Sequence, residues 1–221
     1  MRVGVIRTAL DALFLERRVF CSEADFQFAL AWKIQELFPD SEVRLEYIPG
    51  KFDLNIHIDI AVFIGGEMIP IELKYKTKQF VSPLGAEPVF LKNQGAQDIG
   101  RYDFLSDIQR LERLTEGGKY PIQTAYAIIL TNDSLYWTQP KRHTNTVDQA
   151  FRIHEGTSIH GNRSWAPGTG AGTKQKREEA IQIKGTYRMA WEDYMEAVEC
   201  SSCKFKFSVV KIEKAALERN L

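Results

Sequence analysis

The amino-acid sequence predicts an α/β fold, in which a mixed central β-sheet is flanked by helices and followed by a β-rich C-terminal extension. Three observations favour this class. Two runs rich in β-branched residues meet at a Gly-Gly pair, 65–66, as in a tight hairpin. Segments with helical periodicity lie on either side of that hairpin, at 22–38 and 94–114. A continuous apolar run at 122–131 suits a central strand buried on both faces.

The first predicted helix begins after Ser22, a typical N-cap residue, and ends before Pro39. At about 100° per residue, its apolar stripe contains Leu30, Ile34 and Leu37. Glu23 falls at the N-terminal end of the same stripe, so its carboxylate is expected to point towards whatever the helix packs against. The alternative is that Glu23 only complements the helix dipole in the first turn.

The hairpin strands are predicted over 56–63 and 68–75, with the glycine pair supplying the positive φ angles of the turn. If the loop is centred on that pair, residues that face each other have numbers that add up to 131. Asp59 then faces Glu72, with Cβ atoms about 4.5–5.5 Å apart. Since side chains alternate along a strand, Glu72 and Lys74 share one face.

Two carboxylates this close repel each other, and unpaired charge in a packed layer costs several kcal/mol. A divalent cation between them removes the conflict, and hard oxygen ligands suit Mg²⁺ or Mn²⁺. The spacing therefore predicts a metal site at Asp59 and Glu72, with Lys74 beside it. The alternative is a solvated hairpin face on which Glu72 and Lys74 pair across strands.

Asp59, twelve further residues and then Glu72-Leu73-Lys74 resemble the PD-(D/E)XK nuclease signature of restriction-endonuclease-like folds. The resemblance covers mainly residues 20–131. It implies that the first helix packs on the sheet and that Glu23 is an additional metal ligand. Some relatives carry a Gln-x-x-x-Tyr element on the helix after the Glu-x-Lys strand. Gln97 and Tyr102 are one residue too far apart to match it, so that role is not carried over.

Basic residues indicate where DNA would bind. Lys76 and Lys78 continue the alternation of Lys74, which predicts a cationic stripe leading away from the metal site. In the glycine-rich segment 156–174 and just after it, further candidates for phosphate contact are Arg163, Lys174, Lys176 and Arg177. The alternatives are edge lysines that block strand pairing and a flexible, solvated loop.

The C-terminal part of the chain is predicted to be β-rich, with strands at 180–187 and 205–212 and a loop over 156–174. Residues 189–199 are helical or irregular in this interpretation. The last two strands extend the sheet or form a small subdomain or dimer surface. No linker separates two units, so the 221 residues are expected to form one domain, with a nuclease-like core at about 20–131 and an extension at about 132–221.

Composition is that of an ordinary globular protein, with 44% hydrophobic and 26% charged residues. The formal net charge is zero, so any DNA-binding surface must be local. No apolar run is long enough for a membrane span, and the N-terminus lacks a secretory pattern, which makes a cytoplasmic setting the expectation. Three cysteines argue against a disulfide framework, and Cys200 and Cys203 are expected to be reduced thiols.

The function expected from these residues is Mg²⁺-dependent cleavage of DNA by an endonuclease. Asp59 and Glu72 would hold one or two ions, with the Leu73 carbonyl and Glu23 completing the shell. Lys74 would position or help to deprotonate the attacking water, or stabilise negative charge. Two alternatives stay open: an inactive nucleic-acid- or protein-binding module on the same fold, and an interaction protein whose acids merely pair with lysines. A homodimer is also compatible with the sequence.

Overall fold

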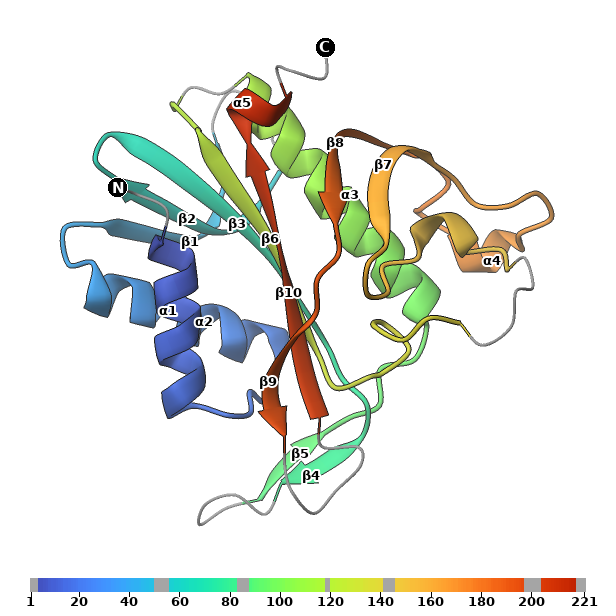
Figure 1. Ribbon diagram of the computed structural model, residues 1–221, viewed down its shortest axis with the longest axis horizontal. Helices are drawn as coiled ribbons and strands as arrows, with labels where there is room; N and C mark the ends of the chain where they lie inside the picture. The colour runs from blue at the N-terminus through green and yellow to red at the C-terminus, as the bar shows by residue number, and fades with distance from the viewer. Residues whose placement is uncertain are drawn as a thin grey trace.

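The computed structural model describes residues 4–49, 56–82, 88–117, 120–140, 146–196 and 204–217. Its centre is a six-stranded sheet with the order β1-β2-β3-β6-β10-β9 (Figure 1). These strands are β1 (Glu42–Tyr47), β2 (Ile58–Ile64), β3 (Glu67–Lys76), β6 (Thr124–Thr131), β9 (Glu192–Glu196) and β10 (Lys204–Glu213). Only the β3–β6 pair is parallel among the pairings in this sheet, so the sheet is mixed and the predicted α/β class is confirmed.

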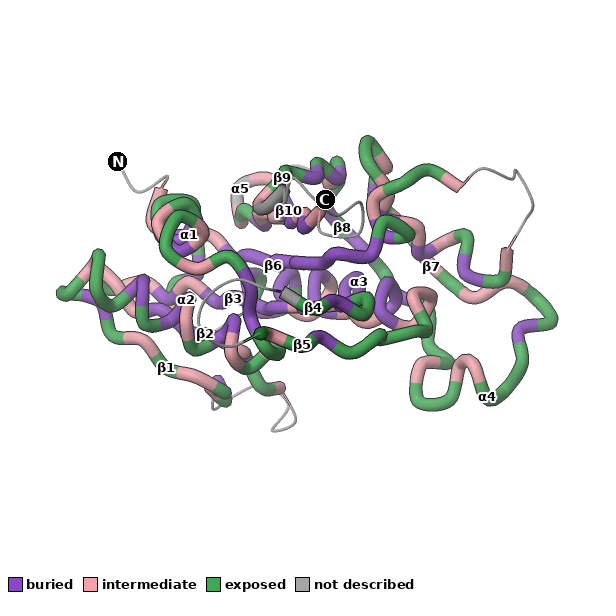
Figure 2. The backbone as a smooth tube through the Cα atoms, turned by 90° about the horizontal axis from the view of Figure 1, so that it is seen from below, coloured by how far each residue is buried: buried purple, intermediate pink, exposed green. Residues whose placement is uncertain are grey.

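Helices cover both faces of the sheet, as Figures 1 and 2 show. Helices α1 (Val5–Glu16) and α2 (Glu23–Leu37) pack on one face, and α3 (Gln97–Glu116) packs on the other. Along β3, Ile71 and Leu73 belong to the core beneath α1 and α2, whereas Met68 belongs to the core beneath α3. Alternation then directs Glu72 and Lys74 towards α3.

The predicted hairpin register is confirmed from Ile60 to Ile64, but the expected pair of Asp59 opposite Glu72 is not formed, because β2 no longer pairs with β3 at Asp59. Strands β2 and β3 pair from Ile60 opposite Ile71 to Ile64 opposite Glu67, so the facing residues add up to 131. Gly65 and Gly66 have φ values of 57° and 80°, which favour glycine at both positions of the turn.

The two predicted helices are also present, with small shifts at their ends. The Ser22 hydroxyl accepts a hydrogen bond from the backbone N–H of Asp25 (3.1 Å), which caps α2 as expected. Helix α3 begins at Gln97 and contains Gly100, against which the Tyr136 hydroxyl lies so closely that a β-carbon would collide with it. Glycine is required there for packing, although it weakens a helix interior.

The predicted strand 122–131 forms β6, which is buried between β3 and β10. The predicted strand 205–212 is β10 and extends the central sheet. The predicted strand 180–187 is β8 (Ile181–Arg188), which pairs with β7 (Ser158–Arg163) in a separate two-stranded sheet. A second small sheet consists of β4 (Phe80–Ser82) and β5 (Val89–Leu91).

Two predictions for the C-terminal part were wrong. The segment 156–174 contains β7 and the short helix α4 (Ala171–Lys174), and 189–199 contains β9. Glycines hid β7 because Gly161, at φ 69°, lies at a register shift within the strand pair rather than ending it. Strand β9 is polar in sequence and forms because β10 offers it an edge. The remaining elements are η1 (Gln149–Phe151) and α5 (Lys214–Leu217).

Among the described residues, none of the helices combines the length and the apolar composition that crossing a lipid bilayer requires. Cys21 is exposed and carries a free thiol. Cys200 and Cys203 lie outside the described residues.

Candidate active site

Strand β2 separates from β3 at Asp59. Its pairing with β3 ends at Ile60, and the position opposite Asp59 on β1 is Glu46, which has a φ of 49°. Such left-handed backbone is uncommon outside glycine and clusters at functional sites. Gln27 of α2 holds the distortion in place, because its Nε2 donates to the Asp59 carbonyl (2.7 Å) and to Glu46 Oε1 (2.8 Å).

The departure of β2 leaves two backbone amides of β3 to be satisfied by side chains. The N–H of Leu73 donates to Asp59 Oδ2 at 2.6 Å, and the N–H of Tyr75 donates to Glu23 Oε2 at 2.6 Å. Both carboxylates therefore lie along the edge of β3 that β2 has vacated. The structure thus places Glu23 against the sheet, as the apolar stripe of its helix predicted.

Glu72 and Lys74 project from the same stretch of β3 towards α3 and meet two residues of that helix. Arg110 donates from Nε to Glu72 Oε1 (2.9 Å), and its Nη2 lies 2.8 Å from Oε2. Lys74 Nζ lies 2.7 Å from Asp107 Oδ2 and also donates to the Leu73 carbonyl (3.1 Å). Arg110 Nη2 closes the network by donating to Asp107 Oδ1 at 2.7 Å.

Burial strongly perturbs these groups, because Glu72 is only 2% exposed and Asp107 only 4%. Burial raises the pKa of Glu72 well above its usual range, the Asp107 charge adds to the rise, and Arg110 opposes both. The pKa of Asp107 is also raised by burial, against the charges of Lys74 and Arg110. Burial lowers the pKa of Lys74, but Asp107 and Glu23 outweigh it and raise the pKa overall, so Lys74 is held as a cation.

The cluster carries more negative than positive charge. Its carboxylates are Glu23, Asp59, Glu72 and Asp107, and its cations are Lys74 and Arg110. Four carboxylates against two cations leave a formal charge of −2 when all six are ionised. The Asp59 charge raises the pKa of both Glu72 and Asp107, which shows that these carboxylates interact electrostatically.

The residues fit a cation in charge and in ligand type, although they do not form a preformed cage. Within the described ranges, no three Asp, Glu, His or Cys side chains are arranged to hold a metal ion. The available ligands are the side chains of Asp59 and Glu72 and the backbone carbonyl of Leu73. All are hard oxygens of the kind that Mg²⁺ and Mn²⁺ prefer, and a divalent ion matches the excess charge.

Sequence reasoning missed two residues of this cluster and a third that supports it. Asp107 and Arg110 were interpreted as part of a polar helix surface with ion pairs, and Gln27 received no role. The signal for these roles was the position of each residue next to the apolar stripe of its helix. Phe26, beside Gln27, and Ile108, beside Asp107, are fully buried. Gln97 instead donates to Asp133, and Tyr102 donates to the Glu179 carbonyl. Neither of these hydrogen bonds reaches the cluster.

The predicted DNA-binding residues divide into two groups. Arg177 pairs with Asp103 at 2.6 Å, and Arg163 donates to three backbone carbonyls in its own part of the chain. Arg163 therefore supports the extension internally, whereas Arg177 links the extension to α3. The four lysines differ: Lys78 and Lys176 are exposed, and Lys76 and Lys174 are partly exposed.

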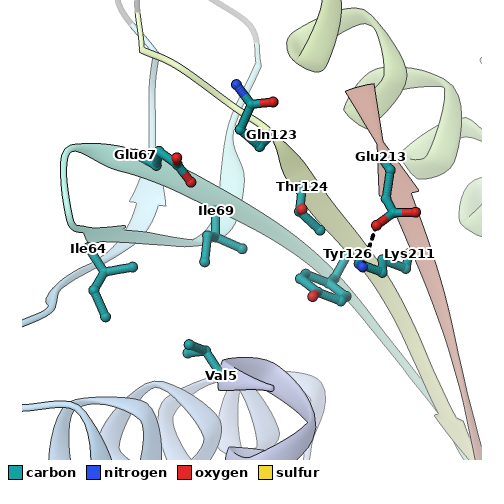
Figure 3. A pocket seen from close by; sticks show the side chains of 9 residues that line it. All are labelled: Val5, Ile64, Glu67, Ile69, Gln123, Thr124, Tyr126, Lys211 and Glu213. Carbon is teal, nitrogen blue, oxygen red and sulfur yellow. Dashed lines mark hydrogen bonds and ion pairs between the residues drawn. The ribbon is translucent and has the colours of Figure 1, made fainter. Parts of the chain in front are cut away.

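A cavity of about 310 Å³ lies elsewhere and shares no residue with the cluster. Figure 3 shows this cavity between the start of α1 and the end of the sheet at which β3 and β6 begin, near the ion pair of Lys211 and Glu213. Its floor includes Ile69 and Tyr126, which lie on the α1 and α2 side of the sheet. It therefore provides no access to Glu72.

Comparison with known proteins gives no further guide. No family model, no curated protein and no solved structure matches this chain.

Proposed function

We propose that this protein is a metal-dependent endonuclease that hydrolyses phosphodiester bonds of DNA. The observation that carries the proposal is the cluster on β3, where two carboxylates, a carbonyl and a protonated lysine converge with an excess of negative charge. Structural ion pairs are normally balanced, because burying uncompensated charge is costly. With all four carboxylates ionised the cluster is two positive charges short, and a divalent cation would supply them and favour the ionised form of Glu72 against the burial that raises its pKa.

Asp59 and Glu72 would hold the ion, together with the Leu73 carbonyl, and Glu23 would complete the shell. When bound, Mg²⁺ or Mn²⁺ lowers the pKa of a coordinated water and neutralises charge on the phosphoryl oxygens. Lys74 stabilises the negative charge that develops on the phosphate and orients the attacking water, because Asp107 keeps it protonated. Its raised pKa supports this electrostatic role over that of a general base.

The first test is cleavage of supercoiled, linear and branched DNA in Mn²⁺. We expect Asp59→Asn, Glu72→Gln and Lys74→Met each to lower the cleavage rate at least about 100-fold, since each removes part of the transition-state stabilisation. Glu116→Gln is the matched control, because Glu116 pairs with Lys184 outside the cluster. Calorimetric titration with Mn²⁺ should show binding to the wild type and to Lys74→Met, and weakened binding to Asp59→Asn. Unchanged cleavage by the Asp59 or Glu72 variant would disprove the mechanism.

One observation favours an inactive binding module as the second candidate. Arg110 already neutralises the buried Glu72 through two contacts, which gives the cluster a stable arrangement without metal. This candidate predicts DNA binding that is equal with and without Mn²⁺, no cleavage, and no heat of Mn²⁺ binding.

A further inference from the structure

The β4–β5 hairpin exposes an apolar pair close in sequence to the proposed active site. Val81 and Phe90 face each other across its two strands and are 51% and 68% exposed. A directly opposed pair forms one continuous surface, so the Phe90 ring and the Val81 side chain present a single apolar platform. Figure 1 shows the hairpin beyond the lower end of the central sheet, where β3 leads into it.

The opposite face of the hairpin fixes this platform in place. Phe80 and Leu91 are 5% and 4% exposed, and the Phe80 ring packs edge-on against Phe205 at 5.5 Å. Burial against the core explains why Phe80 is apolar, but it does not explain the exposed Phe90. Phe90 therefore stands outward on a strand pair that is anchored to the core.

The base of the hairpin is fastened by side-chain hydrogen bonds. Thr77 donates its N–H to Gln94 Oε1 (3.0 Å) and its hydroxyl to the Lys92 carbonyl (2.7 Å). Asn132, at the end of β6, accepts from the Lys78 N–H (2.7 Å) and donates to the Lys78 carbonyl (3.1 Å). A platform fastened to the strands of the active site holds its position relative to Glu72 and Lys74.

Charge around the platform identifies its partner. Residues 75–96 contain three lysines, Lys76, Lys78 and Lys92, and one acid, Glu87, which lies outside the described residues. Lys92 follows β5 directly and is exposed. In a chain with no net charge, this local excess of cations favours an anionic partner over an uncharged apolar one.

We infer that the β4–β5 hairpin is a stacking platform for unpaired bases, with Phe90 under the base and the exposed Lys92, which follows β5, beside the phosphates. Aromatic rings bordered by lysines bind single-stranded nucleic acid because every base offers a face for stacking. Paired bases in a duplex are already stacked and leave no face free. Resting on the proposed function, the inference names its substrate class: DNA with unpaired nucleotides, such as a fork, flap or junction.

The test measures binding in EDTA, where hydrolysis cannot interfere. Fluorescence anisotropy would compare a labelled fork carrying single-stranded arms with a fully paired duplex of the same length. We expect Phe90→Ala to weaken fork binding about 5- to 150-fold, the range of one lost base stack, and to leave duplex binding unchanged. Phe90→Trp should retain fork affinity, and Phe90→Leu should lose it, because leucine keeps the apolar contact but not the aromatic face.

Phe28→Ala is the matched control, since Phe28 is a comparably exposed phenylalanine (60%) on α2. The inference is overturned if Phe90→Ala binds the fork like the wild type, if it weakens fork and duplex equally, or if Phe90→Leu binds like the wild type. Cleavage in Mn²⁺ separates this result from the nuclease proposal. Fork binding that depends on Phe90 without cleavage would disprove only the nuclease, and cleavage unaffected by Phe90→Ala would disprove only the platform.

Discussion

At the scale of single residues, Glu72 has properties that favour a functional role over a purely structural one. It is nearly fully buried and has an arginine partner, yet burial and the neighbouring Asp107 raise its pKa. Desolvation and repulsion thus outweigh attraction at this position. A side chain that the folded protein would hold more easily in neutral form is a mark of a site shaped for something other than stability.

We expect Glu72→Gln to stabilise the metal-free protein. The amide keeps the size of the side chain and removes one of four negative charges, while Arg110 keeps Asp107 as its partner. In EDTA at pH 7, we expect a higher melting temperature for Glu72→Gln than for the wild type. Added Mn²⁺ should raise the melting temperature of the wild type and not that of the variant. A variant less stable than the wild type in EDTA would show that the Glu72–Arg110 pair is structural.

At the scale of elements, α3 joins the candidate active site to the C-terminal extension. One side of the helix reaches Glu72 and Lys74 through Arg110 and Asp107. Another side holds the extension, where Glu112 accepts hydrogen bonds from the backbone of Lys184 and Gly185 and from the Tyr187 hydroxyl. Near its start, Arg101 forms a buried pair with Asp148 at 2.5 Å.

The Arg101–Asp148 pair is expected to be costly to break. Both side chains are less than 10% exposed, and removal of one partner leaves the other charge buried. We expect Arg101→Met to lower the free energy of unfolding by about 3 kcal/mol, near the low end for such pairs, because Arg152 also contacts Asp148. Urea denaturation measures the loss, with Arg113→Met as the exposed control on the same helix. Equal losses in the two variants would refute this account.

At the scale of the whole molecule, we expect these contacts to make the core and the extension one cooperative unit. Besides Arg101 and Glu112, the pairing of Asp103 with Arg177 and the stacking of Tyr102 on Trp165 connect α3 to the extension. Strand β10, from the end of the chain, completes the central sheet next to β6. Separate unfolding of the two parts would expose both hydrophobic clusters.

Urea unfolding followed with two probes tests this cooperativity. Three of the four tryptophans, Trp137, Trp165 and Trp191, lie in the extension, whereas far-UV circular dichroism reports the whole chain. We expect the fluorescence and circular dichroism midpoints to coincide, as in a two-state transition. A fluorescence transition that clearly precedes the other would divide the protein into two folding units.

The sequence by itself determined the elements whose causes are local. The glycine pair set the hairpin register, Ser22 capped α2, and the apolar run of β6 identified a buried central strand. The register also brought Asp59 near the Glu72-Leu73-Lys74 segment, which is why the core of the candidate site was predictable. Each of these features depends on residues close together in the chain.

The tertiary structure alone decided which polar groups meet across long separations. Periodicity placed Asp107 and Arg110 on a polar helix face, but packing on β3 turned that face inwards to Glu72 and Lys74. The edge of β10 made a strand of the polar segment β9, and the departure of β2 at Asp59 gave Glu23 a backbone partner at Tyr75. The physical reason is that burial depends on what covers a face, and the covering element lies elsewhere in the chain.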